Sequence, residues 1–149
     1  MNWLLVALGS LAGGAVRALL SLILPSLSLA GTELPWATLA VNISGAFAIG
    51  LYAALRGPGA AQPASAAEQQ FMMAGVCGGY TTFSIFSVES LALLASGHTL
   101  LTALWVGLSV ASWLLATWLG LLAGERYNAP PAAHAGNPRH VRCQSRHQS

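Results

Sequence analysis

Four apolar stretches, each long enough to cross a membrane as a helix, constrain this chain more than any other feature. They run from about Trp3 to Leu24, Trp36 to Leu55, Glu68 to Ala95 and Thr99 to Leu122. A hydrocarbon core about 30 Å thick takes roughly 20 helical residues. Candidate anchors at the membrane surfaces are Trp36, Trp105, Trp118 and Tyr127. We therefore predict an all-α integral membrane protein with four transmembrane helices and both termini on one side.

The composition also indicates a membrane protein. Hydrophobic residues make up 55% of the 149 residues and charged residues only 7%, whereas a soluble domain carries roughly 25% charged residues. The net charge of +2 comes from six arginines and four glutamates, and three of the arginines lie in the last eleven residues. No basic face for nucleic acid is therefore expected. Cys77 and Cys143 are interpreted as free thiols.

The chain divides into residues 1–127, predicted to be a four-helix transmembrane domain, and residues 128–149, a polar tail predicted to be disordered. Met1 leads directly into apolar sequence, so we expect no cleaved signal peptide. We predict a multi-pass protein of the inner (plasma) membrane. Arg56 and Arg126 lie on the side of the termini, but this positive-inside bias is small. Insertion in either orientation therefore stays open, and the tail favours termini inside.

The third apolar stretch contains a segment that is unusual for a membrane helix. From Gly75 to Glu89 it carries three glycines, several hydroxyls and a carboxylate. Gly78 and Gly79 permit backbone angles that other residues resist. We predict a break in the helix at mid-membrane, from Val76 to Thr82. Carbonyls freed by such a break can hold a cation.

Two further polar residues lie within the first two apolar stretches. Asn42 lies in the middle of the second stretch, where its amide can donate two hydrogen bonds to an anion or join two helices. Arg17 is interpreted as a structural cation or as a residue of a vestibule, and it can extend to the interface. Intramembrane polar groups of this kind are candidates for function.

Phe83 and Phe86 are three residues apart and share one face of the helix that follows the break. Such a pair often only packs, but here it is flanked by hydroxyl residues. Ring edges are electropositive, so together with hydroxyl donors they can replace the water around a small anion. Glu89 would repel an anion, so we expect it to be protonated, hydrogen-bonded or paired with an arginine. The fourth-stretch hydroxyls, including Ser109 and Ser112, more commonly bond to their own helix.

The chain resembles the Fluc (CrcB) fluoride channels in three motifs. They are Gly13-Gly14-Ala15-Val16-Arg17, Thr38-Leu39-Ala40-Val41-Asn42-Ile43-Ser44-Gly45-Ala46-Phe47 and the Gly75–Glu89 segment. The resemblance covers about Leu4 to Tyr127. It implies an antiparallel homodimer with dual-topology insertion and two fluoride pores. It also implies a central structural sodium ion at the dimer interface, held by the main-chain carbonyls of Gly78 and Thr81.

The same resemblance implies a role for individual side chains. Phe83 and Phe86 would line the pore with their ring edges, and Asn42 would be a polar donor. The polar side of the path would comprise Thr82, Ser84, Ser87, Ser109 and Ser112. Ile85 stands where family members often have Thr. The implied function is a fluoride-selective passive channel that exports cytoplasmic fluoride and has fluoride and membrane lipid as its partners.

Three other functions compete with this interpretation. The small four-helix exporters of cationic drugs need a glutamate in the first helix, and this chain has none there. A four-helix assembly subunit would carry no ion flux and would not need Asn42. An intramembrane hydrolase needs a histidine near its nucleophile or metal, whereas all four histidines lie in a loop or the tail. We therefore expect that the protein is not an enzyme.

Overall fold

The computed structural model describes residues 3–23, 27–29, 32–60 and 62–128. Its helices are α1 (Trp3–Ile23), α2 (Trp36–Arg56), α3 (Ala66–Gln69), η1 (Gln70–Cys77), α4 (Gly78–Tyr80), α5 (Phe83–Ala95) and α6 (Thr99–Asn128). The elements α3 to α5 follow one another in one run, Ala66–Ala95. Four segments, namely α1, α2, this run and α6, are long and apolar enough to cross a membrane. The predicted all-helical architecture with four spans is confirmed.

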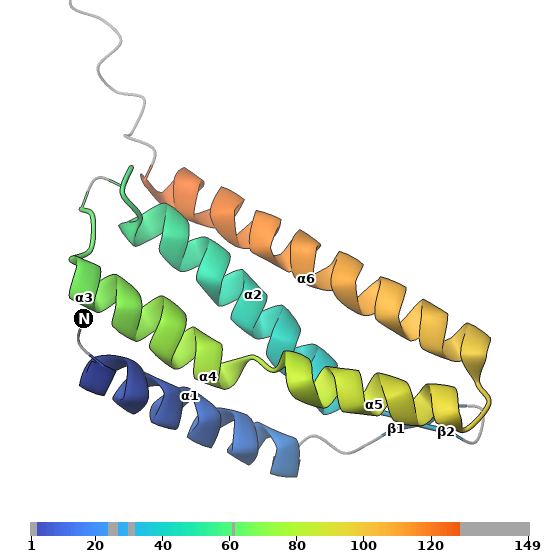
Figure 1. Cartoon of the computed structure of the whole chain (residues 1–149). Helices are drawn as coiled ribbons and strands as arrows, with labels where there is room; N and C mark the ends of the chain where they lie inside the picture. Colours follow the sequence, from blue (N-terminus) through green and yellow to red (C-terminus); the bar gives the residue numbers. More distant parts are fainter. Residues whose placement is uncertain (1–2, 24–26, 30–31, 61, 129–149) are drawn as a thin grey trace, which may run out of the picture.

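The four spans alternate in direction and lie side by side (Figure 1). The first half of the third span, η1 and α4, packs against α1, whereas its second half, α5, packs against α6. The remaining large contact joins α2 and α6. Helix α1 begins and α6 ends at the same end of the bundle (Figure 1), as expected for an even number of crossings.

A short hairpin connects α1 to α2. Its strands, β1 (Leu27–Leu29) and β2 (Thr32–Leu34), are antiparallel, and Leu27 pairs with Leu34. No strands were predicted between the first two apolar stretches. Pairing two three-residue strands satisfies backbone groups that would otherwise depend on water.

Close packing of helix backbones rests on glycines. A Cβ atom placed on Gly13 of α1 would collide with the Val76 carbonyl and lie 2.7 Å from the Tyr80 nitrogen. On the other side of the bundle, Gly50 of α2 faces the Thr117 carbonyl of α6 at a distance that leaves no room for a side chain. Small residues allow this approach, and membrane helices associate largely through such packing.

Helix α6 is longer than predicted. It continues to Asn128 rather than ending near Leu122. Gly124, two residues beyond the predicted end, is buried and packs against Ala54 and Leu51 of α2. The Asn128 amide donates to the Ala54 carbonyl at 2.9 Å, which ties the end of α6 to α2. The predicted tail, apart from Asn128, lies outside the described residues.

The third span is not helical throughout. Helix α4 ends at Tyr80, and both Thr81 and Thr82 have extended backbone angles before α5 begins at Phe83. The non-helical part is shorter than the predicted Val76–Thr82, because η1 and α4 remain helical through the glycines. The η1 segment has the wider π-helical hydrogen-bond pattern. The placement of this interruption at mid-membrane stays a prediction.

The turn after α5 lies between the third and fourth predicted stretches. Gly97 has a φ angle of 86°, and its N–H donates to the Leu94 carbonyl at 3.0 Å. A glycine in this left-handed conformation is a common helix ending, and α6 then begins at Thr99.

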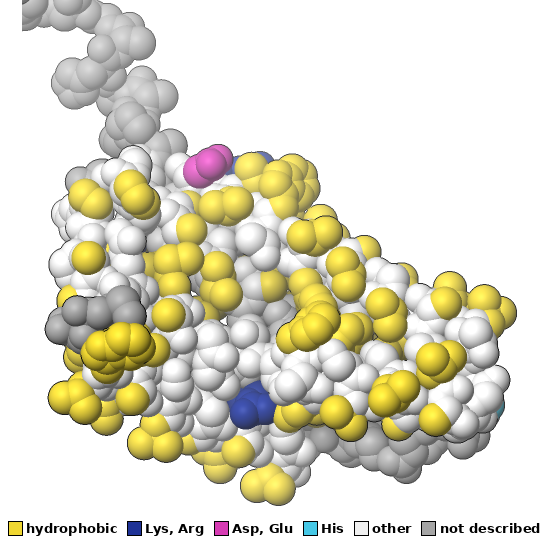
Figure 2. Space-filling model, in the orientation of Figure 1, with side chains coloured by type: hydrophobic (Ala, Val, Ile, Leu, Met, Phe, Trp, Pro, Cys, Tyr) yellow, Lys and Arg dark blue, Asp and Glu magenta, His cyan; other side chains and the backbone are white. Residues whose placement is uncertain are grey.

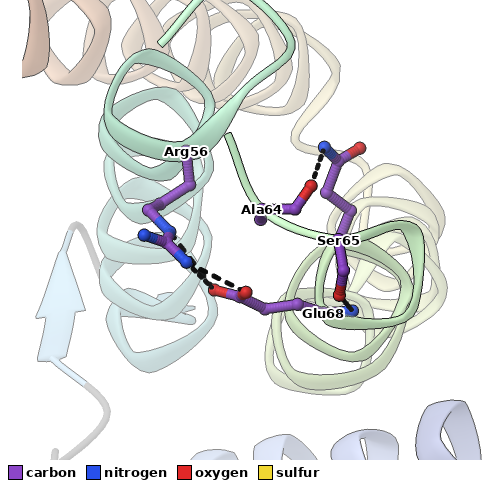
Figure 3. A network of polar contacts seen from close by, with 5 residues as sticks. Arg56, Ala64, Ser65 and Glu68 are labelled. Carbon is purple, nitrogen blue, oxygen red and sulfur yellow. Dashed lines mark hydrogen bonds and ion pairs between the residues drawn. The ribbon is translucent and has the colours of Figure 1, made fainter. Parts of the chain in front are cut away.

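An ion pair joins α2 to α3 across the loop between them, and two other polar contacts lie at the start of α3 (Figure 3). The Arg56 guanidinium donates to both oxygens of Glu68, at 2.9 and 3.0 Å. The Ser65 hydroxyl caps α3 by accepting from the Glu68 N–H, and Gln69 donates to the Ala64 carbonyl. The Arg56 and Glu68 side chains are more than a third exposed, so this pair contributes roughly 0–1 kcal/mol of stability.

The interior of one chain is small, and much of its outer surface is apolar. The buried core cluster comprises Leu34, Phe86, Leu93 and Trp105. Only 11–28% of the most apolar window of each span is buried, and Figure 2 shows hydrophobic side chains spread over the visible face. Such surfaces require an apolar medium or another protein surface.

The glycine packing gives the first testable prediction. We expect Gly13→Ala to lower the free energy of unfolding by about 1–3 kcal/mol, the usual cost of overpacking, because its methyl group meets fixed backbone. Gly107→Ala is the control, since no described atom lies within 4 Å of a Cβ built there. Thermal unfolding in detergent measures both variants. Equal melting temperatures for Gly13→Ala and the parent protein would show that α1 does not pack this closely.

Candidate functional site

The site is organised by Asn42 and the non-helical pair Thr81 and Thr82. The buried Asn42 side chain accepts from the Thr82 N–H at 2.8 Å and donates to the Thr82 carbonyl at 2.9 Å. The Asn42 amide thus pairs with both backbone groups of Thr82, as a neighbouring β-strand would. One amide hydrogen is used in this way, so only one of the two expected donors remains for a ligand. Asn42 therefore joins α2 to the third span and keeps one amide hydrogen without a partner among the described residues.

This arrangement releases two main-chain carbonyls. In a continuous helix, the N–H groups of Thr82 and Ile85 would bond to the carbonyls of Gly78 and Thr81. Here the Thr82 N–H donates to Asn42, and the Ile85 N–H donates to the Thr82 hydroxyl at 3.2 Å. Both carbonyls have lost their usual helical donors. They are the carbonyls that the sequence analysis assigned to a sodium ion.

An open cavity of about 230 Å³ lies beside this segment. It is lined by Asn42, Ala46, Ile49, Thr81, Thr82, Phe83, Trp113 and Thr117. Four of the predicted site residues thus meet here: Asn42, Thr81, Thr82 and Phe83. The lining is neutral, since none of these side chains is an acid or a base.

The two predicted phenylalanines have different surroundings. Phe86 is 4% exposed and belongs to the core cluster, whereas Phe83 is 72% exposed and lines the cavity. Their ring centroids are 5.8 Å apart. Phe86 also meets Trp113 of α6 in an edge-to-face contact with centroids 4.8 Å apart. The aromatic surface of the site therefore continues from α5 onto α6.

The predicted hydroxyl residues fall into two groups. Ser87 donates to the Phe83 carbonyl and Ser112 to the Ser109 carbonyl, each within its own helix. Ser84 is exposed and lies 3.4 Å from the Thr82 hydroxyl. Ser109 is 1% exposed, and its hydroxyl has no partner among the described residues. Of the two α6 serines, Ser109 is therefore the one with an uncommitted donor.

Glu89 and Arg17 line a second cavity, of about 430 Å³. The Thr38 hydroxyl donates to one Glu89 oxygen at 2.8 Å, so Glu89 is hydrogen-bonded, one of its three expected states. The other Glu89 oxygen and the Arg17 Nε are buried without a partner among the described residues. Thr82 lines both cavities and forms part of the wall between them.

Two tryptophans of α6 belong to this region although neither was predicted to. Trp105 was expected to be an interfacial anchor, but it is 5% exposed and packs edge-to-face against Trp36. Trp113 was not considered, yet it lines the cavity. Their spacing of eight residues places both on one helix face with Ser109, and this spacing was available in the sequence.

Comparison with known protein families identifies the family of this chain. Residues 4–121 match the family model described as CrcB-like protein, Camphor Resistance (CrcB). The chain belongs to the CrcB family. This membership confirms the resemblance found in the sequence motifs.

Several curated CrcB relatives are similar over most of the chain. A protein named Fluoride-specific ion channel FluC 1 from Rhodopseudomonas palustris is 51% identical over 124 residues, covering 83% of this chain and 86% of the relative. Fluoride-specific ion channel FluC from Paramagnetospirillum magneticum is 45% identical over 128 residues, covering 86% and 98%. A FluC 1 protein from Bradyrhizobium diazoefficiens is 42% identical over 123 residues, covering 83% and 84%.

These findings agree with two broader predictions. The relatives are named as ion channels, in agreement with the expectation that this CrcB protein is not an enzyme. Together with the four apolar spans, they make it a multi-pass membrane protein, consistent with the plasma membrane.

The bond between Asn42 and Thr82 yields a second prediction. Asn42→Ala leaves a buried N–H and a buried carbonyl unpaired, each at a cost of about 1–3 kcal/mol. We expect a clearly lower melting temperature in detergent. Ser21→Ala on α1 is the control, because the Ser21 hydroxyl is exposed and donates to its own helix at Arg17. If both variants melted like the parent CrcB protein, Asn42 would not hold the interruption in place.

Proposed function

We propose that this CrcB protein is a fluoride-selective passive channel that lets cytoplasmic fluoride leave the cell. The observation that carries the proposal is its similarity, over most of its length, to relatives named as fluoride-specific channels. The neutral cavity beside Asn42 and Phe83 supports it, because it offers donors and ring edges without a fixed charge.

The chemistry of the cavity suits a small anion. Fluoride is strongly hydrated, so a pore must replace its water with close donors that do not hold it too tightly. The second amide hydrogen of Asn42 is one such donor, and the edges of Phe83 and Phe86 present partial positive charge. A larger anion gains less from contacts this short, because Coulomb energy falls with distance.

A passive channel suits the acid chemistry of fluoride. Its conjugate acid crosses membranes in neutral form and dissociates inside at neutral pH, which traps the anion. A fluoride-selective path then allows the anion to leave down its gradient without a coupled energy source. This role places fluoride and the membrane among the partners of the protein.

We infer an antiparallel homodimer with two pores. The exposed ring of Phe83 adjoins exposed serines on α5, Ser84 and Ser87. The Ser44 hydroxyl is also exposed, and it lies 2.7 Å from the Tyr80 hydroxyl. Polar groups facing lipid are unfavourable, so a second copy covering this face is favoured over lipid. The small positive-inside bias of the chain supports insertion in both orientations.

A structural sodium ion fits the carbonyls available at the interruption. Gly78 and Thr81 have carbonyls whose helical donors are engaged elsewhere, and neutral main-chain oxygens of broken helices are typical sodium ligands. A Cβ built on Gly78 meets only the Met73 carbonyl, at 3.6 Å, so this side of the backbone is open. When bound, the ion supplies a fixed positive charge, which favours an anion nearby.

The third prediction tests the channel itself. Purified protein in liposomes should release fluoride rapidly once an ionophore balances charge, and it should release little chloride; a fluoride electrode measures the efflux. Phe83→Ile and Phe86→Ile should each reduce fluoride efflux at least tenfold, because the aliphatic side chain has no electropositive edge. Phe47→Ile is the control, since Phe47 lines neither cavity described above.

Size-exclusion chromatography distinguishes a variant that is folded but inactive from one that is misfolded. This control matters most for Phe86, which is buried. Rapid chloride release by the parent protein would contradict fluoride selectivity. Absence of fluoride release from a folded, reconstituted parent protein would contradict the homodimeric channel.

The fourth prediction concerns sodium. Binding to the folded state alone stabilises a protein by an amount that grows with ligand concentration. We expect the melting temperature in detergent to rise with sodium chloride and not with the chloride of a large organic cation at equal ionic strength. Identical melting curves in the two salts, across the millimolar range, would rule out a stabilising sodium site.

A further inference from the structure

The larger of the two cavities, of about 430 Å³, has both an arginine and a glutamate in its lining. Arg17 and Ser21 come from α1, Thr38 comes from the first turn of α2, and Glu89 comes from α5. We call this space the charged cavity. A path for an anion would not account for a carboxylate in its wall, so the charged cavity requires a further explanation.

The two opposite charges share the charged cavity without forming an ion pair. Within the described residues, the only ion pair is the one between Arg56 and Glu68. One Glu89 oxygen accepts from the Thr38 hydroxyl, whereas the other oxygen and the Arg17 Nε have no partner among the described residues. Charged groups away from bulk water need compensating partners. One ligand that carries both a negative and a positive group would compensate both side chains.

The charged cavity lies near one membrane surface. Ser21 is in the last turn of α1, and Thr38 is in the first turn of α2. Because Glu89 is bonded to Thr38 at 2.8 Å, its carboxylate lies at the level of that first turn. Arg17 lies one helical turn further inside than Ser21. Spans of this length end close to the edge of the hydrocarbon core, so lipid headgroups are within reach of the charged cavity.

The bundle leaves room for a lipid beside the charged cavity. Helix α1 packs against η1 and α4, and α5 packs against α6, while α1 and α5 make no extensive contact with each other. Next to the cavity residues Ser21 and Glu89, the apolar side chains of Leu22 and Val88 are 84% and 68% exposed. Acyl chains can cover such side chains while a headgroup reaches the charges.

We propose that the charged cavity binds the headgroup of phosphatidylethanolamine, with its phosphate at Arg17 and its ammonium at Glu89. A guanidinium matches the geometry of phosphate oxygens, and a primary ammonium has three N–H donors for the free Glu89 oxygen. Arg17 lies deeper than Glu89, and in this lipid the phosphate is the charged group nearer the acyl chains. This site goes beyond the proposed channel function and does not depend on it.

The two charges predict which lipids bind less well. Phosphatidylglycerol has the phosphate but no cation, so it would leave Glu89 uncompensated beside a second negative group. Phosphatidylcholine has three methyl groups in place of the N–H donors, so it cannot donate to Glu89. If water instead bridged Arg17 and Glu89, the protein would not distinguish these headgroups.

The first test measures lipid binding to the full-length parent protein. Dioleoyl phosphatidylethanolamine, its N-methylated forms, dioleoyl phosphatidylcholine and dioleoyl phosphatidylglycerol are each titrated into the protein in detergent, and native mass spectrometry measures the bound fraction. We expect phosphatidylethanolamine to bind about tenfold tighter or more than the last two lipids, because each of them leaves a buried charge unpaired. Affinity should fall as methyl groups replace the N–H donors. This series needs no variant and therefore no assumption about folding.

The second test assigns the charges to residues. Arg17→Gln and Glu89→Gln should each weaken phosphatidylethanolamine binding by about tenfold or more, and Glu89→Gln should also reduce the preference over phosphatidylcholine. Glu125→Gln and Arg126→Gln are the matched controls, because both residues are exposed and lie near the end of α6. The controls should bind phosphatidylethanolamine within about twofold of the parent, as expected for exposed charges.

The outcomes decide between a lipid and other occupants. Selective binding of phosphatidylethanolamine that both cavity variants lose supports the site. Equal binding of all the lipids by the parent, or selectivity that survives in folded Arg17→Gln and Glu89→Gln, overturns it. Soluble O-phosphoethanolamine carries the same two charges without acyl chains, and binding as tight as that of the lipid would identify a soluble zwitterion and overturn the lipid site. None of these results bears on fluoride efflux, which the third prediction tests separately.

Discussion

The hydrogen bonds between Asn42 and Thr82 are the interaction on which the rest of the site depends. A membrane offers no water to a peptide group that leaves a helix, yet Thr81 and Thr82 are extended. Asn42 supplies one acceptor and one donor to Thr82, so the helix can be interrupted without leaving that residue unpaired. The same bonds take the Thr82 N–H away from Gly78. One asparagine thereby stabilises the interruption and frees a carbonyl.

The packing of the bundle explains where the interruption lies. Before it, η1 and α4 pack against α1 through backbone contacts that require Gly13. After it, α5 packs against α6 through larger side chains such as Phe86 and Trp113. A single straight helix would have to pack against both α1 and α6 along one axis direction. The extended residues Thr81 and Thr82 allow the two halves to pack separately, and the cavity beside Asn42 lies at this change of partner.

Much of this architecture could be predicted from the sequence, because span length and apolar composition are local properties. The starts of α2 at Trp36 and of α6 at Thr99 agree with prediction. The hydrogen-bond partners of individual hydroxyls could not be predicted, because they depend on which acceptors lie nearby once the helices have packed. Ser109 and Ser112 look alike in sequence, but only Ser112 bonds to its own helix. Burial of Trp105 likewise depends on contacts with distant residues.

The two cavities differ in charge, and this difference bears on selectivity in the proposed channel. The larger one is lined by Arg17 and Glu89, whereas the smaller one has a neutral lining. A fixed arginine beside a dehydrated fluoride would bind it strongly and slow its exit. The Asn42 amide and the ring edge of Phe83, both in the lining of the smaller cavity, would compensate lost water in smaller steps. Because Thr82 borders both cavities, an anion attracted by Arg17 would leave charged surroundings at Thr82 and enter the neutral path there.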